Sequence, residues 1–329
     1  MILLNRSATA SARHHTYLLF SRLYLDGLTN DLLPFIAGIP ELEAVAPRPF
    51  DQDQAAAIHY QVFIHDIFPH ESIFRDPSGL IGGSYAEQVN AIYKQAAIHI
   101  TANHDHIGHE LAFLATLCSA ESTILGDREI EALDQIHQLQ KMFLQDHLLC
   151  WLSPFVAALA FSNEPFYSTL GRLTLSLVVD HFLSLCPEGS SEPIDCFDKN
   201  DLQELPQILQ DNQTNLKQIA GFILTPPHSG LYFGQSSLST MANERQLPRG
   251  FGNRQQMLTN LFHAAAQYDL IPDLLRDLSA HAETWGHKYE RQLADFPEIS
   301  TWIRPWLRRV NSTAVALSDM RKQLSIATI

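Results

Sequence analysis

The sequence predicts an all-α fold, and three of its features support that prediction. Apolar residues recur three and four positions apart through most of the chain, as at Val89, Ile92, Tyr93 and Ala96, and this spacing places them on one face of a helix. Polar residues that favour helix starts precede many of these segments. Alternating apolar and polar residues bounded by hairpin turns, the pattern of strands, are not found in the sequence.

Seven helices are expected in the N-terminal part, and several of their starts have matching sequence signals. Asp51 with Gln54, and Ser84 with Glu87, have the spacing of a capping box, in which two side chains satisfy free backbone N–H groups at the helix start. A new helix is expected at Pro154, because proline is favoured in the first turn. The expected helices cover residues 7–25, 51–65, 84–100, 104–120, 127–151, 154–161 and 165–185.

A change in composition divides the chain. Residues 186–200 are rich in Pro, Gly, Ser and acidic side chains, which is typical of a linker. The 329 residues are more than one small core needs. We therefore expect a helical domain over residues 1–185, the linker, and a second helical domain over residues 201–329. The expected helices of the second domain cover residues 213–224, 236–246, 253–267, 269–292 and 299–324.

The charge balance limits the classes of partner. Lys and Arg number 22 against 36 Asp and Glu, a net charge of -14, which repels phosphate backbones and anionic lipid surfaces. Acidic side chains instead favour cationic peptides, and arginine in particular. The apolar N-terminal run is short for a secretory signal, and no window has the roughly 18 apolar residues of a membrane span. We expect a cytoplasmic protein without a nucleic-acid partner or stable membrane insertion.

Signatures of catalysis and of cofactor binding are missing from the sequence. The cysteines lack the Cys-x-x-Cys spacing of zinc and iron–sulfur sites. Phosphate-binding loops, dinucleotide fingerprints and the common hydrolase motifs are not found. No catalytic residue, no metal site and no cofactor are therefore expected. The four cysteines are Cys118, Cys150, Cys186 and Cys196.

Three patches between Tyr60 and Trp151 are the candidates for function. The first lies in the segment 68–83, which is long for a helix connection, and loops of this length are often functional. Its aromatic residues could hold the apolar part of a peptide, while Glu71 and Asp76 could pair with arginines. Alternatively, the aromatic residues only anchor the loop in the core.

The second and third patches lie on predicted helices. His106 and Glu110 share one face of the helix that starts near residue 104, where histidines could also bind a metal. Phe143, His147 and Trp151 are four residues apart and form one stripe. His147 is either a histidine of the core or a polar anchor in a binding groove.

The three patches resemble motifs of the TorD/DmsD/NarJ-type molybdoenzyme maturation chaperones, over about residues 12–185. The matching residues are Pro69, Ser72, Phe74 and Asp76 in the first patch, Asp105, His106, Ile107, Glu110 and Leu111 in the second, and Phe143, His147, Leu148 and Trp151 in the third.

The resemblance implies a TorD-like helical bundle, followed here by a second C-terminal helical domain. It implies a cytoplasmic chaperone, not an enzyme. Such a protein binds the apo form and the twin-arginine leader of a molybdopterin oxidoreductase subunit, assists cofactor insertion before export, and can form a homodimer. The client-binding candidates are Phe68, His70, Glu71, Ser72, Phe74, Asp76, Asp105, His106, Glu110, Phe143, His147 and Trp151.

Two alternatives stay open. The chain could be a helical scaffold or dimerisation module without leader specificity. The His104-Asp105 pair also resembles HD-type metal-dependent phosphohydrolases, which need further ligands from other segments. The candidates for those ligands are His59, His65, His70, Asp146 and Asp180.

Overall fold

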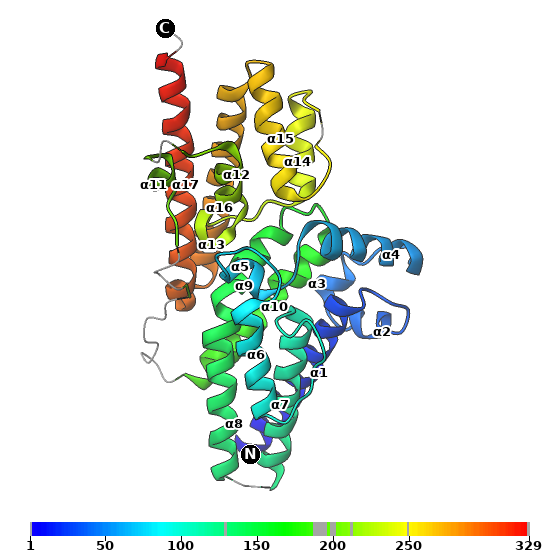
Figure 1. Ribbon diagram of the computed structural model, residues 1–329. Coiled ribbons are helices and arrows are strands. Elements are labelled where there is room, and N and C mark those ends of the chain that lie inside the picture. Colours follow the sequence, from blue (N-terminus) through cyan, green and yellow to red (C-terminus); the bar gives the residue numbers. More distant parts are fainter. Residues whose placement is uncertain are drawn as a thin grey trace. The chain divides into compact units, whose positions relative to one another are not determined.

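The computed structural model describes residues 2–127, 130–186, 196–197, 202–210, 213–248 and 250–327, and these residues form helices and loops (Figure 1). Within these ranges the only strand-like pairing is a single backbone bridge between His70 and His106. The all-α prediction is confirmed.

The chain divides into two compact units. The first comprises Met1–Ser72, Leu80–Leu152 and Asn163–Glu192, and the second comprises Ile73–Gly79, Ser153–Ser162 and Pro193–Ile329. Two short segments of the N-terminal half therefore belong to the second unit. Most of the expected linker, residues 186–200, lies outside the described residues, so the domain boundary there stays a prediction.

The helices of the first unit include two π-helical segments, η1 and η2. Two of the helices, α5 and α9, continue into residues of the second unit. The elements are α1 (Ile2–Leu25), α2 (Leu33–Ile36), α3 (Pro40–Glu43), α4 (Gln52–His59), η1 (Tyr60–Asp66), α5 (Glu71–Arg75), α6 (Gly83–Gln95), α7 (Ile107–Asp127), α8 (Ile130–Phe143), η2 (Leu144–Leu148), α9 (Leu149–Leu159) and α10 (Pro165–Leu185).

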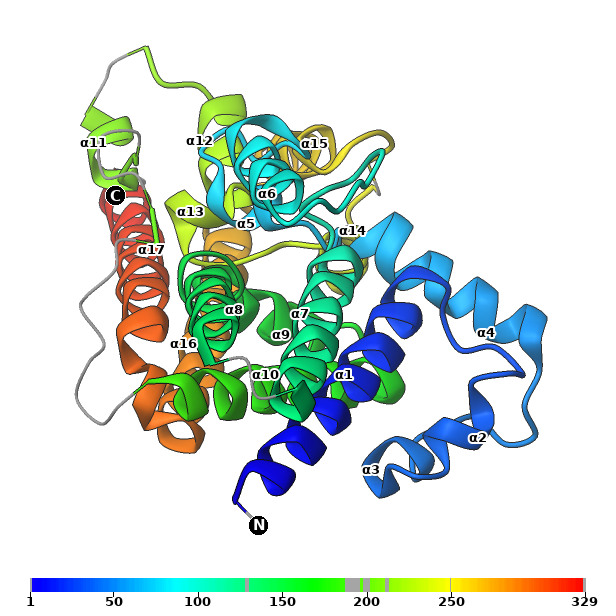
Figure 2. The ribbon, with the colours of Figure 1, turned by 90° about the horizontal axis from the view of Figure 1, so that it is seen from below.

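The packing of α1 along α7 forms the largest helix pair of the first unit, and Figure 2 shows the two side by side. Gly108, in the first turn of α7, allows a close approach. A Cβ atom at this position would lie 2.5 Å from Cγ of Leu25, which is well inside van der Waals contact. Tyr17 and Leu23 of α1 are fully buried.

Some of the helix starts predicted from local sequence signals are confirmed by the structure, and others are wrong. Asp51 caps α4 as expected, since its side chain accepts a hydrogen bond from the N–H of Gln54 at 3.0 Å. The prediction of a capping box at Ser84 is wrong. Helix α6 starts at Gly83, and the residue before it, Gly82, makes no side-chain cap. The prediction that a new helix starts at Pro154 is also wrong, since Pro154 lies inside α9.

The helix continues through Pro154 because the residues around this proline are buried. Residues 151–159 are all buried, so the packing of this segment outweighs the lost hydrogen bond and the steric clash that proline brings to a helix interior. The stretch Ala132–Leu159 has the length and apolar composition of a membrane span, contrary to expectation. However, 83% of its most apolar window is buried within the protein, which is also typical of a core helix.

The second unit contains seven α-helices within its described C-terminal residues. They are α11 (Leu205–Gln210), α12 (Leu216–Leu224), α13 (Pro226–Ser229), α14 (Gln235–Glu244), α15 (Arg254–Gln267), α16 (Ile271–Asp295) and α17 (Ser300–Ala327), with the 3-10 helix η4 (Pro297–Ile299) between the last two.

The core of the second unit is built around the long helices α16 and α17, which pack along each other (Figure 2). Trp285 of α16 and Trp302 and Trp306 of α17 are fully buried. Gly230 ends α13 with a φ of +80°, where a Cβ atom would lie 2.4 Å from the backbone N of Val310. Only glycine fits this left-handed position so close to another helix.

Candidate functional site

The first two sequence patches are joined by backbone hydrogen bonds. The N–H of Ile107 donates to the carbonyl oxygen of Pro69 at 2.9 Å, and the N–H of Glu71 donates to the carbonyl oxygen of Asp105 at 2.9 Å. These bonds flank the bridge between His70 and His106. The loop after residue 68 is thereby fixed against the start of α7.

The carboxylate of Asp105 holds the start of α5. Its Oδ2 accepts a hydrogen bond from the N–H of Ser72 at 2.9 Å, and its Oδ1 lies 3.3 Å from Nδ1 of His70. Burial alone would raise the pKa of Asp105, but the contacts with His70 and Ser72 outweigh it and lower the pKa below its usual value. Asp105 is therefore a buried carboxylate with its partners in place.

The hydroxyl of Ser72 connects this region to the next loop. Its Oγ accepts a hydrogen bond from the N–H of Gly82 at 3.0 Å. The side chains next to Gly82 are apolar and face solvent, with Leu80 68% exposed and Ile81 48% exposed. Because the N–H of Ser72 donates to Asp105, hydrogen bonds connect the buried carboxylate to the loop that carries these two apolar side chains.

The third patch contributes the partner of Glu71. Nδ1 of His147 lies 3.1 Å from Oε1 and 3.0 Å from Oε2 of Glu71. Both side chains are buried, at 6% and 0% exposure. Phe143 stacks on the other side of the histidine ring, with the ring centroids 5.2 Å apart. His147 is thus a histidine of the core with a specific acidic partner.

Glu110 is a second buried acid beside this pair. The indole Nε1–H of Trp151 donates to its Oε2 at 3.3 Å. Burial, followed by the negative charges of Glu71 and Asp105, raises the pKa of Glu110 well above its usual value. These surroundings favour the neutral carboxylic acid over the carboxylate.

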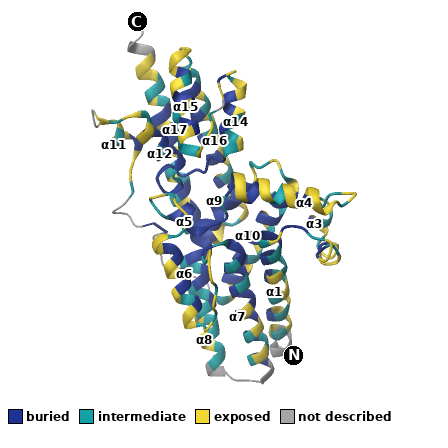
Figure 3. Cartoon of the chain, turned by 45° about the vertical axis from the view of Figure 1, so that its right-hand side comes forward, coloured by how far each residue is buried: buried dark blue, intermediate teal, exposed yellow. Residues whose placement is uncertain are grey.

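Nine of the candidate residues therefore gather in one place, which we call the acid–histidine cluster. All of them except His106 are fully buried, and His106 is mostly so. Figure 3 shows α5 and α9 as buried helices. The three patches thus come together in the structure, and Glu71, one of the two acids expected to pair with arginines of a peptide, lies inside the protein. The cluster consists of His70, Glu71, Ser72, Asp105, His106, Glu110, Phe143, His147 and Trp151.

Three candidate residues are not among these nine. Phe74 is part of the second unit, where its ring stacks on Tyr232 with the centroids 5.4 Å apart. Asp76 is half-buried and forms a turn, since its Oδ1 accepts the N–H of Ser78 at 2.8 Å. Phe68 is half-buried. The sequence-based list omits the exposed Leu80 and Ile81, although their place between Pro77 and Gly82 marks them as loop residues.

The geometry does not support a metal site at His104-Asp105. Nε2 of His104 lies 3.0 Å from the carbonyl oxygen of Ile100, and the Asp105 carboxylate is engaged by Ser72 and His70. Within the part of the chain that the structure describes, the only group of three or more His, Cys, Asp and Glu with converging donor atoms lies elsewhere.

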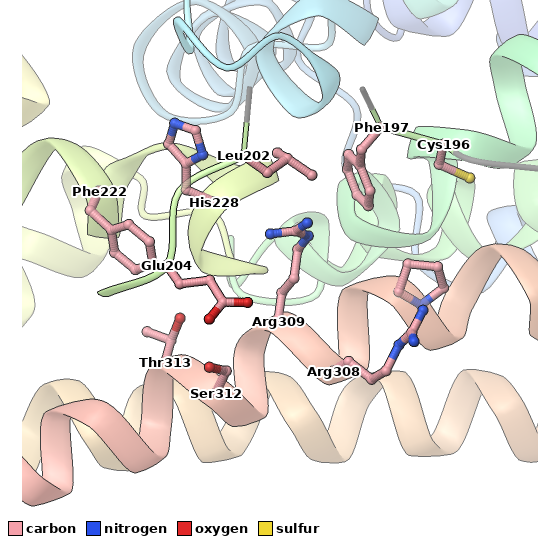
Figure 4. A pocket seen from close by; sticks show the side chains of 11 residues that line it. Cys196, Phe197, Leu202, Glu204, Phe222, His228, Arg308, Arg309, Ser312 and Thr313 are labelled. Carbon is pink, nitrogen blue, oxygen red and sulfur yellow. The ribbon is translucent and has the colours of Figure 1, made fainter. Parts of the chain in front are cut away.

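The second unit has a cavity of its own, with a volume of about 350 Å³. Arg308 and Arg309 of α17 and Glu204 are the charged groups of its wall (Figure 4). The guanidinium carbon of Arg309 lies 4.9 Å from the centre of the Phe197 ring. His228 of α13 also lines this cavity.

Comparisons with known proteins found similarity over the segment that contains the acid–histidine cluster. Residues 30–157 match the family described as "Nitrate reductase delta subunit", and this segment contains every residue of the cluster. The match therefore covers the helical segment in which the three sequence patches meet.

Two curated relatives have the same name. The chain is 28% identical to "Chaperone protein TorD" of Vibrio vulnificus strain YJ016 over 167 residues, which are 47% of this chain and 76% of the relative. The protein of strain CMCP6 gives the same identity and coverage. Over this segment the chain is similar to the TorD chaperones, as the motifs predicted. The family match ends at residue 157, before most of the second unit.

Proposed function

We propose that this protein is a cytoplasmic maturation chaperone for a molybdopterin oxidoreductase. It binds the apo form of one enzyme subunit together with its twin-arginine leader, and it assists cofactor insertion before export. The observation that carries this proposal is the family match over residues 30–157, the segment that contains the complete acid–histidine cluster. An acidic chain with a net charge of -14 suits a leader with two arginines.

The buried residues of the cluster do not contact the leader themselves. They hold in place the loop that contacts it. Ser72 and Asp105 hold the loop that presents Leu80 and Ile81, and these exposed side chains suit the apolar part of a leader. Asp76 is the candidate acid of the first patch that solvent reaches, and it can pair with an arginine of the leader.

Leader binding is the direct test. Fluorescence anisotropy with a labelled twin-arginine leader should give saturable binding, and a leader with both arginines replaced by lysine should bind more weakly, because lysine cannot make the bidentate bond to a carboxylate. Added salt should weaken the arginine-dependent part. Equal binding of the two leaders would instead favour a scaffold without leader specificity.

The loop has a matched control within the first unit. The double variant Leu80→Ser/Ile81→Ser should weaken leader binding at least about tenfold, since each buried aliphatic side chain contributes about 1.5–3 kcal/mol. Phe35→Ser removes another exposed apolar side chain, 61% exposed and located on α2, and should leave binding unchanged. Equal losses in the two variants would remove the loop from the binding surface.

Client identity and maturation need the native host. A pull-down read by mass spectrometry should recover a molybdopterin oxidoreductase subunit in its apo form. Asp105→Ala should lower the molybdenum content of that client, because the loop loses its support. Phosphatase activity dependent on a divalent metal, with no client recovered, would favour the phosphohydrolase alternative. Light scattering of the purified protein would establish whether it forms a homodimer.

A further inference from the structure

A second buried polar group lies in the first unit, away from the acid–histidine cluster. Cys118 and Glu121 are three residues apart on α7, so they share one helix face, and His181 lies on α10. One ligand atom from each residue can be chosen so that all three atoms lie within 4.8 Å of one another. The side chains are buried, at 0%, 6% and 0% exposure in this order.

His181 has a ring nitrogen without a hydrogen-bond partner. Its Nδ1 lies 3.1 Å from the hydroxyl of Tyr17, whereas its buried Nε2 makes no hydrogen bond within the described residues. An unsatisfied buried polar atom is unfavourable, because it has lost its hydrogen bonds to water without replacement. Burial, and then the charge of Arg13, lowers the pKa of His181 to about 3. The ring is thus neutral, and with the proton on Nδ1 the Nε2 lone pair is free to bind a ligand.

Glu121 is held as a carboxylate by its neighbours. Nε2 of His137 lies 3.1 Å from its Oε1, and Nε2 of Gln140 donates to its Oε2 at 3.0 Å. Burial alone would raise the pKa of Glu121, but these hydrogen bonds outweigh it and lower the pKa below its usual value. Orientation of a ligand by an outer layer of hydrogen bonds is typical of protein metal sites.

Cys118 completes the donor set. Burial and the charge of Glu121 raise the pKa of its thiol to about 12, so the sulfur is protonated when no cation is bound. A divalent cation would displace this proton and bind the thiolate, releasing one H⁺ to solvent. The thiolate and the carboxylate together would then balance a charge of +2.

We propose that Cys118, Glu121 and His181 form a zinc-binding site that links α7 to α10. Sulfur, imidazole and carboxylate ligands suit Zn²⁺, whereas Ca²⁺ and Mg²⁺ prefer oxygen ligands alone. Zinc bond lengths place the ligand atoms of a tetrahedral site about 3.3–3.6 Å apart. Since the present separations are at most 4.8 Å, small side-chain rotations are sufficient. The sequence motifs gave no indication of this site.

Metal content is the first measurement. The full chain, without an affinity tag and treated with a chelator, is incubated with Zn²⁺, passed through a desalting column and analysed by mass spectrometry for metals. We expect about one tightly held zinc ion per chain. Because the chain has 16 histidines, the ligands must be identified as well. Co²⁺ in place of Zn²⁺ should give a thiolate-to-metal absorption band, which Zn²⁺ should remove.

Variants identify the ligands. Cys118→Ser should abolish the thiolate band, and Cys118→Ser and His181→Gln should each weaken zinc binding by at least about tenfold, the loss seen even when an outer-layer residue is changed. Cys150→Ser is the matched control, since Cys150 is also fully buried in the first unit but is not part of the donor group. It should keep both the band and the zinc.

Three outcomes would overturn the proposal. They are a wild-type protein without tightly held zinc, a Co²⁺ spectrum without a thiolate band, and equal zinc binding by the Cys118 and Cys150 variants. The first two require no variant, so the proposal stays falsifiable if Cys118→Ser does not fold. None of these outcomes bears on leader binding.

Discussion

The buried pair of Glu71 and His147 gives a quantitative prediction of stability. Their side chains are 0% and 6% exposed and 3.0 Å apart. His147→Leu leaves the Glu71 carboxyl group buried without this hydrogen-bond partner, and an unsatisfied buried polar group costs about 1–3 kcal/mol, more when it is charged. Glu71→Gln keeps the shape but removes the charge, and should cost about 1.5–3 kcal/mol, the contribution of a hydrogen bond to a charged group.

The double variant Glu71→Gln/His147→Leu separates charge from packing. With no charge left at position 71, the leucine at position 147 should cost less than in the wild type, by about 1–3 kcal/mol. Urea unfolding followed by circular dichroism gives the free energies. Two units can unfold separately. Hydrogen exchange of peptides from α7, which lies in the first unit, shows whether that unit is the one destabilised.

A control and a refuting result accompany this cycle. Glu87→Gln changes an exposed acid on α6 and should alter the free energy of unfolding by no more than about 0.5 kcal/mol. If His147→Leu costs the same with Glu or Gln at position 71, the two side chains are not coupled. The hydrogen bond between Glu71 and His147 would then contribute nothing to the stability of the acid–histidine cluster.

Two further predictions concern Glu110 and Gly108. Because the pKa of Glu110 is raised in the folded state, its contribution to stability is complete below the unfolded pKa of about 4.3 and is lost as the pH rises through the folded pKa. Glu110→Gln mimics the neutral acid, so the wild type should lose stability relative to the variant as the pH rises. Urea titrations at several pH values measure the two free energies of unfolding, and a difference that stays constant with pH would contradict this prediction. Gly108→Ala places a Cβ atom 2.5 Å from Leu25 and should destabilise by about 1–3 kcal/mol, measured by urea unfolding. Gly221→Ala is the control for Gly108→Ala, because the Cβ atom at position 221 meets only the flexible end of Gln255. Equal changes in the free energy of unfolding for the two variants would show that α1 can move away from α7 without cost.

The long helices could be predicted from the sequence, and the shortest could not. The helix expected at residues 165–185 is α10, Pro165–Leu185, since a run of this length shows its period several times. The helices α2 and α3 have four residues each. One turn does not repeat the apolar spacing, so it gives no periodic signal.

The sequence by itself determined the helical class and the chaperone motifs, because both depend on spacings of a few residues along the chain. Tertiary structure alone decided that Asp105 and Glu71 are buried, that Phe74 joins the second unit, and that Cys118 meets His181 from 63 positions away. Burial and donor distances follow from the packing of helices that are distant in sequence, and local periodicity does not determine that packing.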